Sequence, residues 1–216
     1  MRTGDYAELP TADAIREAAA DLFLEHGYAA TTLREIADRV GLKVGSLYNH
    51  IDSKEQLLGE ILRTVMTSLH GEIDAALSHV DDDAVERFHR VFEAHIRFHA
   101  EHARKVFIGN SEMRSLSDQD SRKVRRSRRE YEAKIRGLID DIASQTEAVV
   151  IDPQFQTYVI LAMAPHLASW YDPAGPRSLD EIVNIYRALA VRQLGLSDDR
   201  LEPLMKPIEV NGELSE

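Results

Sequence analysis

Helical periodicity is the feature of this sequence that most limits what the chain can fold into. Apolar residues recur every three or four positions along most of the chain, and the alternation that is typical of strands is nearly absent. In residues 12–26 one helical face collects Ile15, Ala18, Ala19, Leu22 and Phe23. Gly27 follows, as glycine does after a helix C-terminus. We therefore predict an all-α protein.

The composition indicates a soluble protein with a sizeable core. Of the 216 residues, 44% are hydrophobic, which is enough to bury such a core. The absence of cysteine excludes disulfides, thiolate metal sites and a cysteine nucleophile. Residues 1–10 contain Asp5 and Glu8 and no apolar run, so we expect no signal peptide. Apolar stretches such as residues 158–170 are too short to cross a bilayer, and we expect a cytoplasmic location.

Two short helices around a glycine form the most informative motif. Thr32 and Glu35 have the spacing of a capping box, in which each side chain satisfies a free backbone N–H at a helix start. Gly41 breaks that helix, and a second short helix is expected from Lys43 or Val44. The inward residues of the pair are Leu33, Ile36, Ala37, Val40, Leu47 and Ile51. Together with the preceding helix they predict a helix-turn-helix, although three ordinary helices could have the same spacing.

The outward face of the second short helix suits duplex DNA. Its residues are Lys43, Val44, Ser46, Tyr48, Asn49 and His50. Lysine, serine and asparagine side chains can reach base edges, whereas tyrosine and histidine can donate hydrogen bonds to phosphates. Gly45 costs helix stability, about 1 kcal/mol relative to alanine, but its missing side chain would let the backbone approach DNA closely.

The net charge of −11 opposes DNA binding at long range. The charge is uneven, however, because four Lys and Arg side chains outnumber three carboxylates between residues 31 and 54. Since the local charge at the contact face decides binding, we expect the acidic balance to weaken the affinity for DNA without abolishing it.

Four ordered signatures lie between residues 18 and 58. They are Gly27-Tyr28-x-x-Thr31-Thr32, Ile36-Ala37, Gly45-Ser46-Leu47-Tyr48 and Ser53-Lys54-Glu55. This ordered set closely resembles the TetR family of bacterial repressors. The resemblance implies a dimer, a variable helical ligand-binding body, and DNA contacts on both sides of the turn.

The resemblance also implies which residues contact DNA. Phosphate contacts are expected on both sides of the turn, and base contacts within residues 43–49. The predicted DNA-binding residues are Thr31, Thr32, Arg34, Lys43, Val44, Ser46, Tyr48, Asn49, His50 and Lys54. Two positions depart from the family pattern: Lys43 stands where a capping serine or threonine is common, and Ile51 replaces the usual phenylalanine.

The rest of the chain is expected to form long helices. Ser53 and Gln56 form a second predicted capping box, which starts a helix that runs past Leu69. Further helices are expected at about residues 83–101, 104–115, 121–144, 153–170 and 179–194, and Pro165 should kink one of them. We predict a helix-turn-helix DNA-binding domain over residues 1–56, a larger helical ligand-binding and dimerisation domain over 57–196, and a loose tail over 197–216.

The body contains no motif of an enzyme. There is no glycine-rich phosphate loop, no Gly-x-Ser-x-Gly elbow and no His-Glu-x-x-His sequence, so we predict neither enzymatic activity nor a cofactor. His95, His99 and His102 share one face of a helix. Such imidazoles can bind a metal, but they can equally line a ligand pocket or pack in the core, and these alternatives stay open.

A dense basic run lies near the middle of the body: Arg122, Lys123, Arg125, Arg126, Arg128 and Arg129. Its ordinary interpretation is a solvated face, paired with Glu130 and Glu132. An anionic effector is the alternative, because guanidinium groups match phosphates bidentately.

A second, more distant resemblance favours the anionic effector. It rests on the basic run, on Glu112-x-Arg114-x-Leu116 and on Trp170-Tyr171-x-Pro173-x-Gly175-Pro176. These segments are similar to TetR-type regulators of fatty-acid, aromatic-acid and steroid-ring breakdown, which implies an acyl-CoA effector. The predicted ligand-binding residues, an apolar tunnel with arginines at its mouth, are Phe92, Ile96, His99, Phe107, Ile108, Arg125, Arg129, Tyr131 and Met163.

The sequence therefore predicts a ligand-responsive repressor that a small molecule releases from a palindromic operator. A multidrug-type repressor with a hydrophobic, drug-like effector is the alternative, and a protein whose head no longer binds DNA is a third interpretation. The last two long helices are expected to form the homodimer, or else simply to cover their own core. Their apolar residues are Val159, Ile160, Met163, Leu167, Trp170, Ile182, Ile185, Tyr186, Leu189 and Val191.

Overall fold

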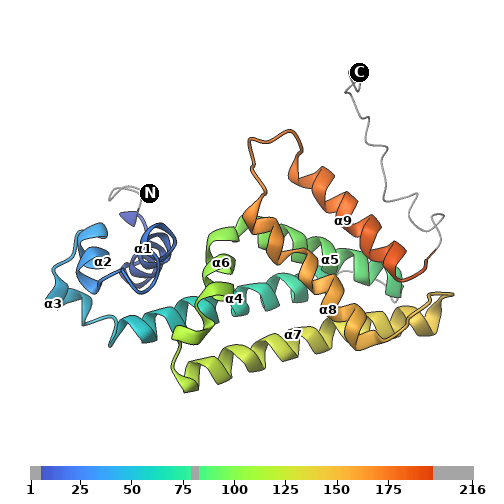
Figure 1. Cartoon of the computed structure of the whole chain (residues 1–216), viewed down its shortest axis with the longest axis horizontal. Helices are drawn as coiled ribbons and strands as arrows, with labels where there is room; N and C mark the ends of the chain where they lie inside the picture. Colours follow the sequence, from blue (N-terminus) through green and yellow to red (C-terminus); the bar gives the residue numbers. More distant parts are fainter. Residues whose placement is uncertain (1–5, 79–82, 197–216) are drawn as a thin grey trace. The chain divides into compact units, whose positions relative to one another are not determined.

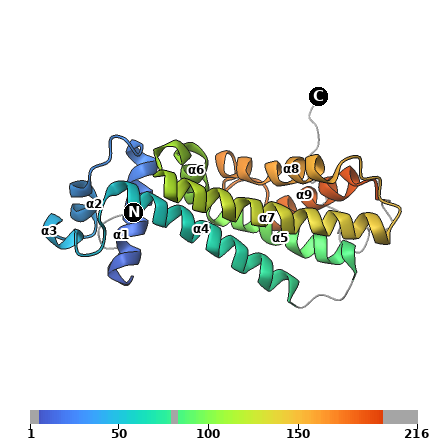
Figure 2. The ribbon, with the colours of Figure 1, turned by 90° about the horizontal axis from the view of Figure 1, so that it is seen from below.

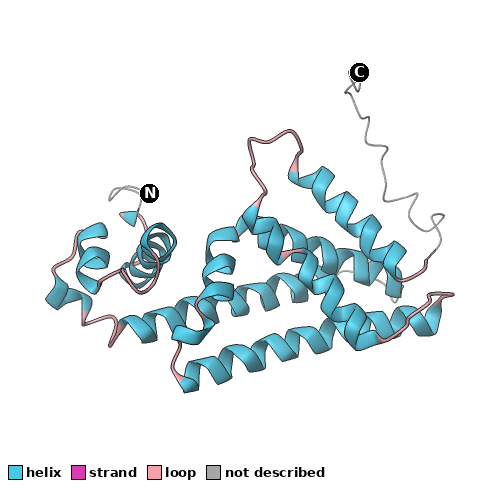
Figure 3. Ribbon diagram, viewed as in Figure 1, coloured by secondary structure: helices cyan, strands magenta, loops and turns pink. Residues whose placement is uncertain are grey.

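A computed structural model describes residues 6–78 and 83–196, and every regular element in these two ranges is a helix (Figure 3). The predicted all-α class is therefore confirmed. The predicted loose tail over residues 197–216 lies outside the described residues. No helix in the described ranges is long and apolar enough to cross a membrane.

The chain divides into two compact units, each built from two stretches of sequence. The first unit comprises residues 1–71 and 102–131, and the second comprises residues 72–101 and 132–216. The helices α4 (Lys54–Leu77) and α7 (Asp118–Gln145) contribute residues to both units. The first unit also holds α1 (Thr11–His26), α2 (Leu33–Arg39), α3 (Val44–Leu47), α6 (Ala103–Ser111) and the 3₁₀ helix η2 (Met113–Ser115). The second also holds α5 (Ala84–Glu101), α8 (Pro153–Met163), the 3₁₀ helix η3 (Pro165–Ser169) and α9 (Leu179–Gln193).

The observed helices follow the predicted ones closely, with two interruptions. The helix expected over residues 104–115 ends as α6 at Ser111, and η2 follows it. The helix expected over residues 153–170 ends at Met163, and η3 begins at Pro165. Proline has no backbone N–H and its ring clashes with the preceding turn, so Pro165 breaks the helix rather than only kinking it.

In the first unit α4 and α7 run side by side in the same direction (Figures 1 and 2). Arg63 pairs with Asp120, and seven residues further along both helices His70 Nε2 lies 3.1 Å from the backbone oxygen of Ser127. Gly59 allows the close approach at the start of α7, because a Cβ atom there would lie 2.7 Å from Asp120 Oδ2. We call the Gly59, Arg63 and Asp120 contact the α4–α7 clasp.

The helix α6 packs against α1 through charged groups. Arg104 pairs with Asp21 at 2.6 Å, and Lys105 pairs with Glu17. The Asp21 carboxylate is buried and also accepts a 2.7 Å hydrogen bond from the Tyr6 hydroxyl. Burial and the bond to Asp21 raise the pKa of Tyr6 to about 12, so this hydroxyl keeps its proton. Two partners thus satisfy the one buried carboxylate of α1.

In the second unit α5 and α9 pack antiparallel. Arg187 on α9 pairs with Glu93 at 3.3 Å, and Asp180, at the start of α9, pairs with Arg97 at 2.5 Å. The core beside these pairs is aromatic, with the rings of Phe88 and Phe92 stacked at 5.7 Å between centroids. Along α7, in both units, one helical face is buried: Val124, Tyr131, Ile135, Leu138, Ile139 and Ile142.

Candidate nucleic-acid interface

Local signals in the sequence build the turn between α2 and α3. The Thr32 hydroxyl accepts a hydrogen bond from the backbone of Glu35, and the Glu35 carboxylate accepts one from the backbone of Thr32, which completes the predicted capping box. Gly41 has a φ of +73°, a left-handed conformation that costs glycine little. The chain then turns so that the Leu42 N–H bonds to Ala37 O at 2.9 Å. The helix-turn-helix geometry follows from these contacts.

The helix α3 is shorter than predicted. It has one α-helical turn, after which i→i+3 bonds continue from Asn49 to Ser46 and from His50 to Leu47. Lys43 precedes it without a side-chain cap, as expected where lysine replaces a capping serine or threonine. Leu47, which is fully buried, anchors this segment to the unit. Because so few backbone bonds hold the segment, its position depends chiefly on the burial of Leu47.

The outer face of this segment is open to solvent. Lys43, Tyr48, Asn49 and His50 are exposed, and Val44 and Ser46 are half-buried. Nothing lies within 4 Å of the position a Cβ would take at Gly45, so no packing inside the unit requires glycine there. A glycine on an open face leaves room for another molecule to approach the backbone, as we expect for DNA.

Two of the predicted DNA-binding residues are engaged inside the protein. The Thr31 hydroxyl is buried and donates to the backbone oxygens of Leu22 and Gly27, at 3.1 and 2.9 Å. Lys54 Nζ donates to the backbone oxygens of Tyr28 and Thr31, at 2.8 and 2.7 Å, and lies 4.5 Å from the centroid of the Tyr28 ring. These bonds tie the loop before α2 to the start of α4. A phosphate contact by either side chain stays a prediction and would need these bonds to be exchanged.

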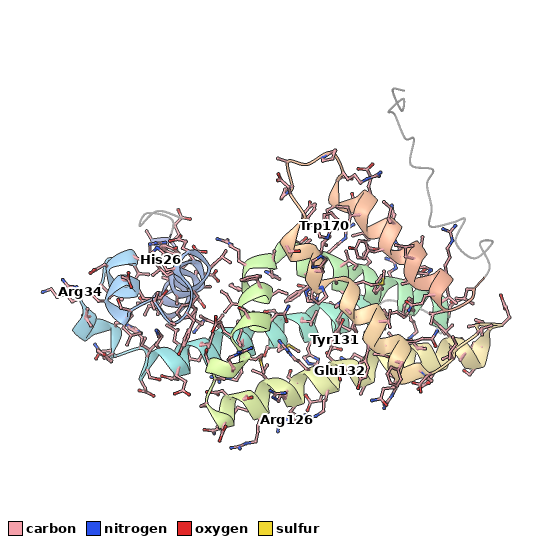
Figure 4. All side chains as sticks on the ribbon, viewed as in Figure 1. His26, Arg34, Arg126, Tyr131, Glu132 and Trp170 are labelled. Carbon is pink, nitrogen blue, oxygen red and sulfur yellow. The ribbon has the colours of Figure 1, made fainter. Side chains whose placement is uncertain are left out.

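Cations border the open face of the turn. Arg34 projects from α2 into solvent (Figure 4), with 83% of its side chain exposed and Asp38 3.9 Å away. Arg39, in contrast, is held by both carboxylate oxygens of Glu25, at 3.2 and 2.8 Å. Arg34 and Lys43 are therefore the cations with most freedom to meet DNA, whereas Arg39 braces α2 against α1.

The start of α4 differs from the predicted capping box. Ser53 Oγ accepts a 3.0 Å bond from the backbone of Gln56, as expected. The Gln56 side chain, however, accepts from the backbone of Asp52 at 2.5 Å and donates to Glu60 at 2.9 Å. The serine half of the box is confirmed, whereas the Gln56 side chain bonds to the backbone N–H of Asp52 and not to that of Ser53.

The predicted ligand-binding residues are distributed over both units. Phe92, Ile96 and His99 are buried in the second unit, which also contains Met163. Ile108 and Tyr131 are buried in the first unit, and burial raises the pKa of Tyr131 well above its usual range. Phe107 is 50% exposed, and Arg125 and Arg129 are exposed. The predicted ligand-binding set therefore includes residues of both units.

The three histidines in and just after the last part of α5 belong to different units. His95 and His99 are buried in the second unit with ring centroids 4.5 Å apart, whereas His102 belongs to the first unit. Burial, and secondarily the neighbouring His99, lowers the pKa of His95 well below its usual value, so the ring of His95 is neutral. The described ranges contain no group of three His, Cys, Asp or Glu side chains arranged to hold a metal.

Comparisons with known proteins agree with this geometry. The family described as "Bacterial regulatory proteins, tetR family" matches residues 15–61, and the family described as "Tetracyclin repressor-like, C-terminal domain" matches residues 81–194. The HTH-type transcriptional repressor KstR2 of Mycolicibacterium smegmatis is 30% identical over 185 residues, which are 83% of this chain and 88% of that protein.

Solved structures show the same fold. A tetR-family regulatory protein from Rhodococcus RHA1 has a TM-score of 0.80 and 28% identity, over 87% of this chain and 98% of that chain. AibR, solved in complex with isovaleryl coenzyme A and operator DNA, has a TM-score of 0.75 and 23% identity, over 82% of this chain and 96% of that chain. The N-terminal family match, the C-terminal family match over more than half of the chain and the KstR2 match over 83% of it show that the chain belongs to the TetR family of transcriptional regulators.

Proposed function

We propose that the protein is a repressor that binds a palindromic operator as a homodimer and is released by a small molecule of the acyl-CoA class. Members of the family are DNA-binding regulators and not enzymes, so we assign no catalytic residue. A regulator that binds operator DNA acts in the bacterial cytoplasm, which we propose as the location of this protein. The observation that carries the proposal is the solvent-exposed polar face from Lys43 to His50, which the buried Leu47 holds in place.

The proposed base contacts are the predicted ones, and the proposed phosphate contacts differ from the prediction at Thr31 and Lys54, whose side chains bond within the protein. Lys43, Val44, Ser46 and Asn49 face bases in the major groove. Thr32, Arg34, Tyr48 and His50 contact phosphates, and Thr31 and Lys54 position the loop whose backbone approaches the DNA strand. We retain residues 1–56 as the proposed DNA-binding domain and residues 57–196 as the proposed ligand-binding and dimerisation domain, with the boundary inside α4.

Exposed apolar side chains on α8 and α9 support the proposed dimer. Phe155, Tyr158 and Val159 share one face of α8 and are 67%, 43% and 51% exposed, and Leu189 on α9 is 49% exposed. Monomeric proteins rarely expose so many large apolar groups together. Other residues that were expected in the interface are buried in the core of their own unit: Ile160, Leu167, Ile182 and Val191. Covering the core accounts for these four, and the exposed set forms the proposed contact between copies.

A dimer of such heads would need a spacing of about 34 Å to enter successive major grooves. Within the first unit Lys54 ties the loop before α2 to α4, and the ion pairs of Arg104 and Lys105 tie α1 to α6. An effector that favours another position of α4 or α6 would therefore move the head and shift the population away from DNA.

The effector class rests on relatives and on chemistry. AibR shares this fold and was solved with isovaleryl coenzyme A, so the fold can accommodate a CoA thioester. The proposed acyl-chain contacts are Phe92, Ile96, His99, Phe107, Ile108, Tyr131 and Met163, and the proposed anion contacts are Arg125 and Arg129. A multidrug-type repressor would share the apolar contacts without using the arginines.

Fluorescence anisotropy with a labelled palindromic duplex from the region beside the protein's own gene tests the proposal. We expect tight binding at low salt, no comparable binding to a scrambled duplex of equal length, and release by a medium-chain or steroid-ring acyl-CoA. Equal binding to both duplexes would refute the repressor. Release by hydrophobic cationic drugs and by no acyl-CoA would favour the multidrug alternative.

A further inference from the structure

Tyr6 lies just before α1 and is buried within the first unit, with 2% of its surface exposed. Its ring belongs to a small apolar cluster with Ala14 and Ala18 of α1, and Val40, the residue after α2, packs against this cluster. The ring therefore lies where α1 meets the end of α2. A buried phenol needs hydrogen-bond partners for its hydroxyl, and those of Tyr6 come from both of these helices.

The Tyr6 hydroxyl connects two ion-pair systems. It donates to Asp21 Oδ2 at 2.7 Å, and the other oxygen of the same carboxylate accepts from Arg104 of α6 at 2.6 Å. Burial and the bond to Asp21 raise the pKa of Tyr6, and a hydrogen bond with Arg39 of α2 partly offsets this rise. Arg39 is itself held by Glu25 of α1. A continuous chain of polar contacts thus runs from α6 to α2, and we call its members Arg104, Asp21, Tyr6 and Arg39 the tyrosine relay.

A neighbouring ion pair shows what is particular to the tyrosine relay. Lys105, the residue after Arg104, pairs with Glu17, which lies one helical turn before Asp21 on α1. Among the described residues, neither Lys105 nor Glu17 has a hydrogen bond or ion pair with α2. Both pairs join α6 to α1, but of the two only the pair of Arg104 and Asp21 continues to α2.

The tyrosine relay has little freedom to rearrange. Asp21 is 5% exposed, and a buried carboxylate that loses one of its partners costs stability. A shift of α6 that moves Arg104 therefore favours a matching shift of Asp21 and Tyr6. The turn that places α3 begins directly after Arg39 and has its left-handed residue at Gly41. The position of α3 consequently depends on the α2 end of the tyrosine relay.

We propose that Tyr6 is a positioning residue for DNA binding, whose hydroxyl couples the end of α2 to α6. A phenyl ring alone could fill the cluster of Ala14 and Ala18, so the hydroxyl is what this role requires. The proposal rests on the operator binding of the proposed function and requires nothing of the chemistry of the effector. Groups that are coupled in this way have non-additive effects when both are replaced, which a purely local contact would not show.

Tyr6→Phe tests the proposal, because it keeps the ring and removes the hydroxyl. We expect its affinity for the palindromic duplex, measured by fluorescence anisotropy, to fall about tenfold, since the Asp21 carboxylate loses a partner. Arg104→Met should cause a similar fall in the wild type, but a fall of no more than about twofold in the Tyr6→Phe background. The matched control is Lys105→Met, which breaks the parallel ion pair and should have the same small effect in both backgrounds.

Hydrogen exchange of the unbound chain is a second measurement, which does not need an operator. Peptides from residues 33–50 should exchange faster in Tyr6→Phe and in Arg104→Met than in the wild type, and at the wild-type rate in Lys105→Met. Urea denaturation shows whether each variant is folded under the conditions of both measurements. If Tyr6→Phe does not fold, the comparison of Arg104→Met with Lys105→Met decides the question.

The outcomes separate the tyrosine relay from the proposed function. If the wild type binds no duplex but the exchange rates differ as expected, the coupling of α2 to α6 stands and the proposed function fails. If the wild type binds the duplex while Tyr6→Phe keeps its affinity and its exchange rates, the tyrosine relay is overturned and the proposed function stands. Additive losses of affinity in Tyr6→Phe and Arg104→Met, or an equal loss in Lys105→Met, would also overturn it, since the hydroxyl would then act on α1 alone.

Discussion

The two units solve the problem of buried polar groups in different ways. In the first unit, Asp21 and Thr31 are buried and each has hydrogen-bond partners. In the second unit, His89 is 1% exposed and neither of its ring nitrogens has a partner among the described residues. An unsatisfied buried polar group costs stability, so His89 is a weak point of the second unit that Asp21 and Thr31 do not create in the first. Hydrogen-bonded buried groups keep the first unit in one conformation, as binding to the regular geometry of duplex DNA requires.

Replacing the anchors of the two units would test this comparison most severely. Leu47 and Ile160 are each fully buried, so Leu47→Ala and Ile160→Ala should each lower the free energy of unfolding by about 3 kcal/mol. Only Leu47→Ala should abolish operator binding by the folded protein, because α3 has one turn. Urea denaturation and duplex anisotropy measure the two effects. Leu24→Ala, at a 41% exposed position, is the control. Retained operator affinity in Leu47→Ala would contradict the anchoring role.

Acid should destabilise the second unit through His89. Burial, aided by the nearby Arg187 charge, lowers the pKa of His89 from 6.5 to about 4. Because the unfolded chain then binds the proton more readily, stability is lost as the pH falls from 6.5 through 4, by about 3 kcal/mol. In His89→Leu the free energy of unfolding should fall less between pH 6.5 and 4, and the remaining fall should include the effect of His95. Identical slopes of unfolding free energy against pH in the wild type and the variant would show that His89 is not buried as described.

The two capping boxes offer a matched pair. Thr32 with Glu35 starts α2 in the first unit, and Ser178 with Glu181 starts α9 in the second. Thr32→Ala and Ser178→Ala should each cost about 1 kcal/mol in thermal or urea unfolding. Operator affinity should fall in Thr32→Ala alone, because α2 positions α3. A similar fall in Ser178→Ala would mean that operator binding is sensitive to any loss of stability.

The smallest expected effect concerns the start of α3. Lys43 provides no side-chain cap, so Lys43→Ser should stabilise the first unit by about 0.5 to 1 kcal/mol. Lys43→Ala removes the same charge without adding a cap and is the matched control. The base preference of both variants is measured over a set of half-site sequences. If it changes equally in Lys43→Ser and Lys43→Ala, the lysine ammonium determines that preference. No gain in stability for serine over alanine would contradict the interpretation of an uncapped start.

The sequence predicted best those features that depend on neighbours within four residues. The capping box of Thr32 and the break at Gly41 were both predicted correctly. Contacts between distant residues were not predictable in the same way. Thr31 turns inward to Leu22, nine residues earlier, and Lys54 reaches Tyr28, 26 residues earlier. Periodicity carries no information about such partners, and the half-exposed Phe107 shows the same limit for the proposed effector contacts.

The two helices that contribute to both units have a consequence for anyone who dissects or recombines this regulator. Residues 71 and 72 adjoin within α4, and residues 131 and 132 adjoin within α7, so neither border offers a flexible linker to a protease. A fragment cut after residue 56 would also lack α6 and the clasp that support α1 and α4. A chimera that exchanges the effector-binding part therefore needs three junctions, after residues 71, 101 and 131. The junctions within α4 and α7 should be spliced in helical register, with residues 102–131 kept in the DNA-binding part.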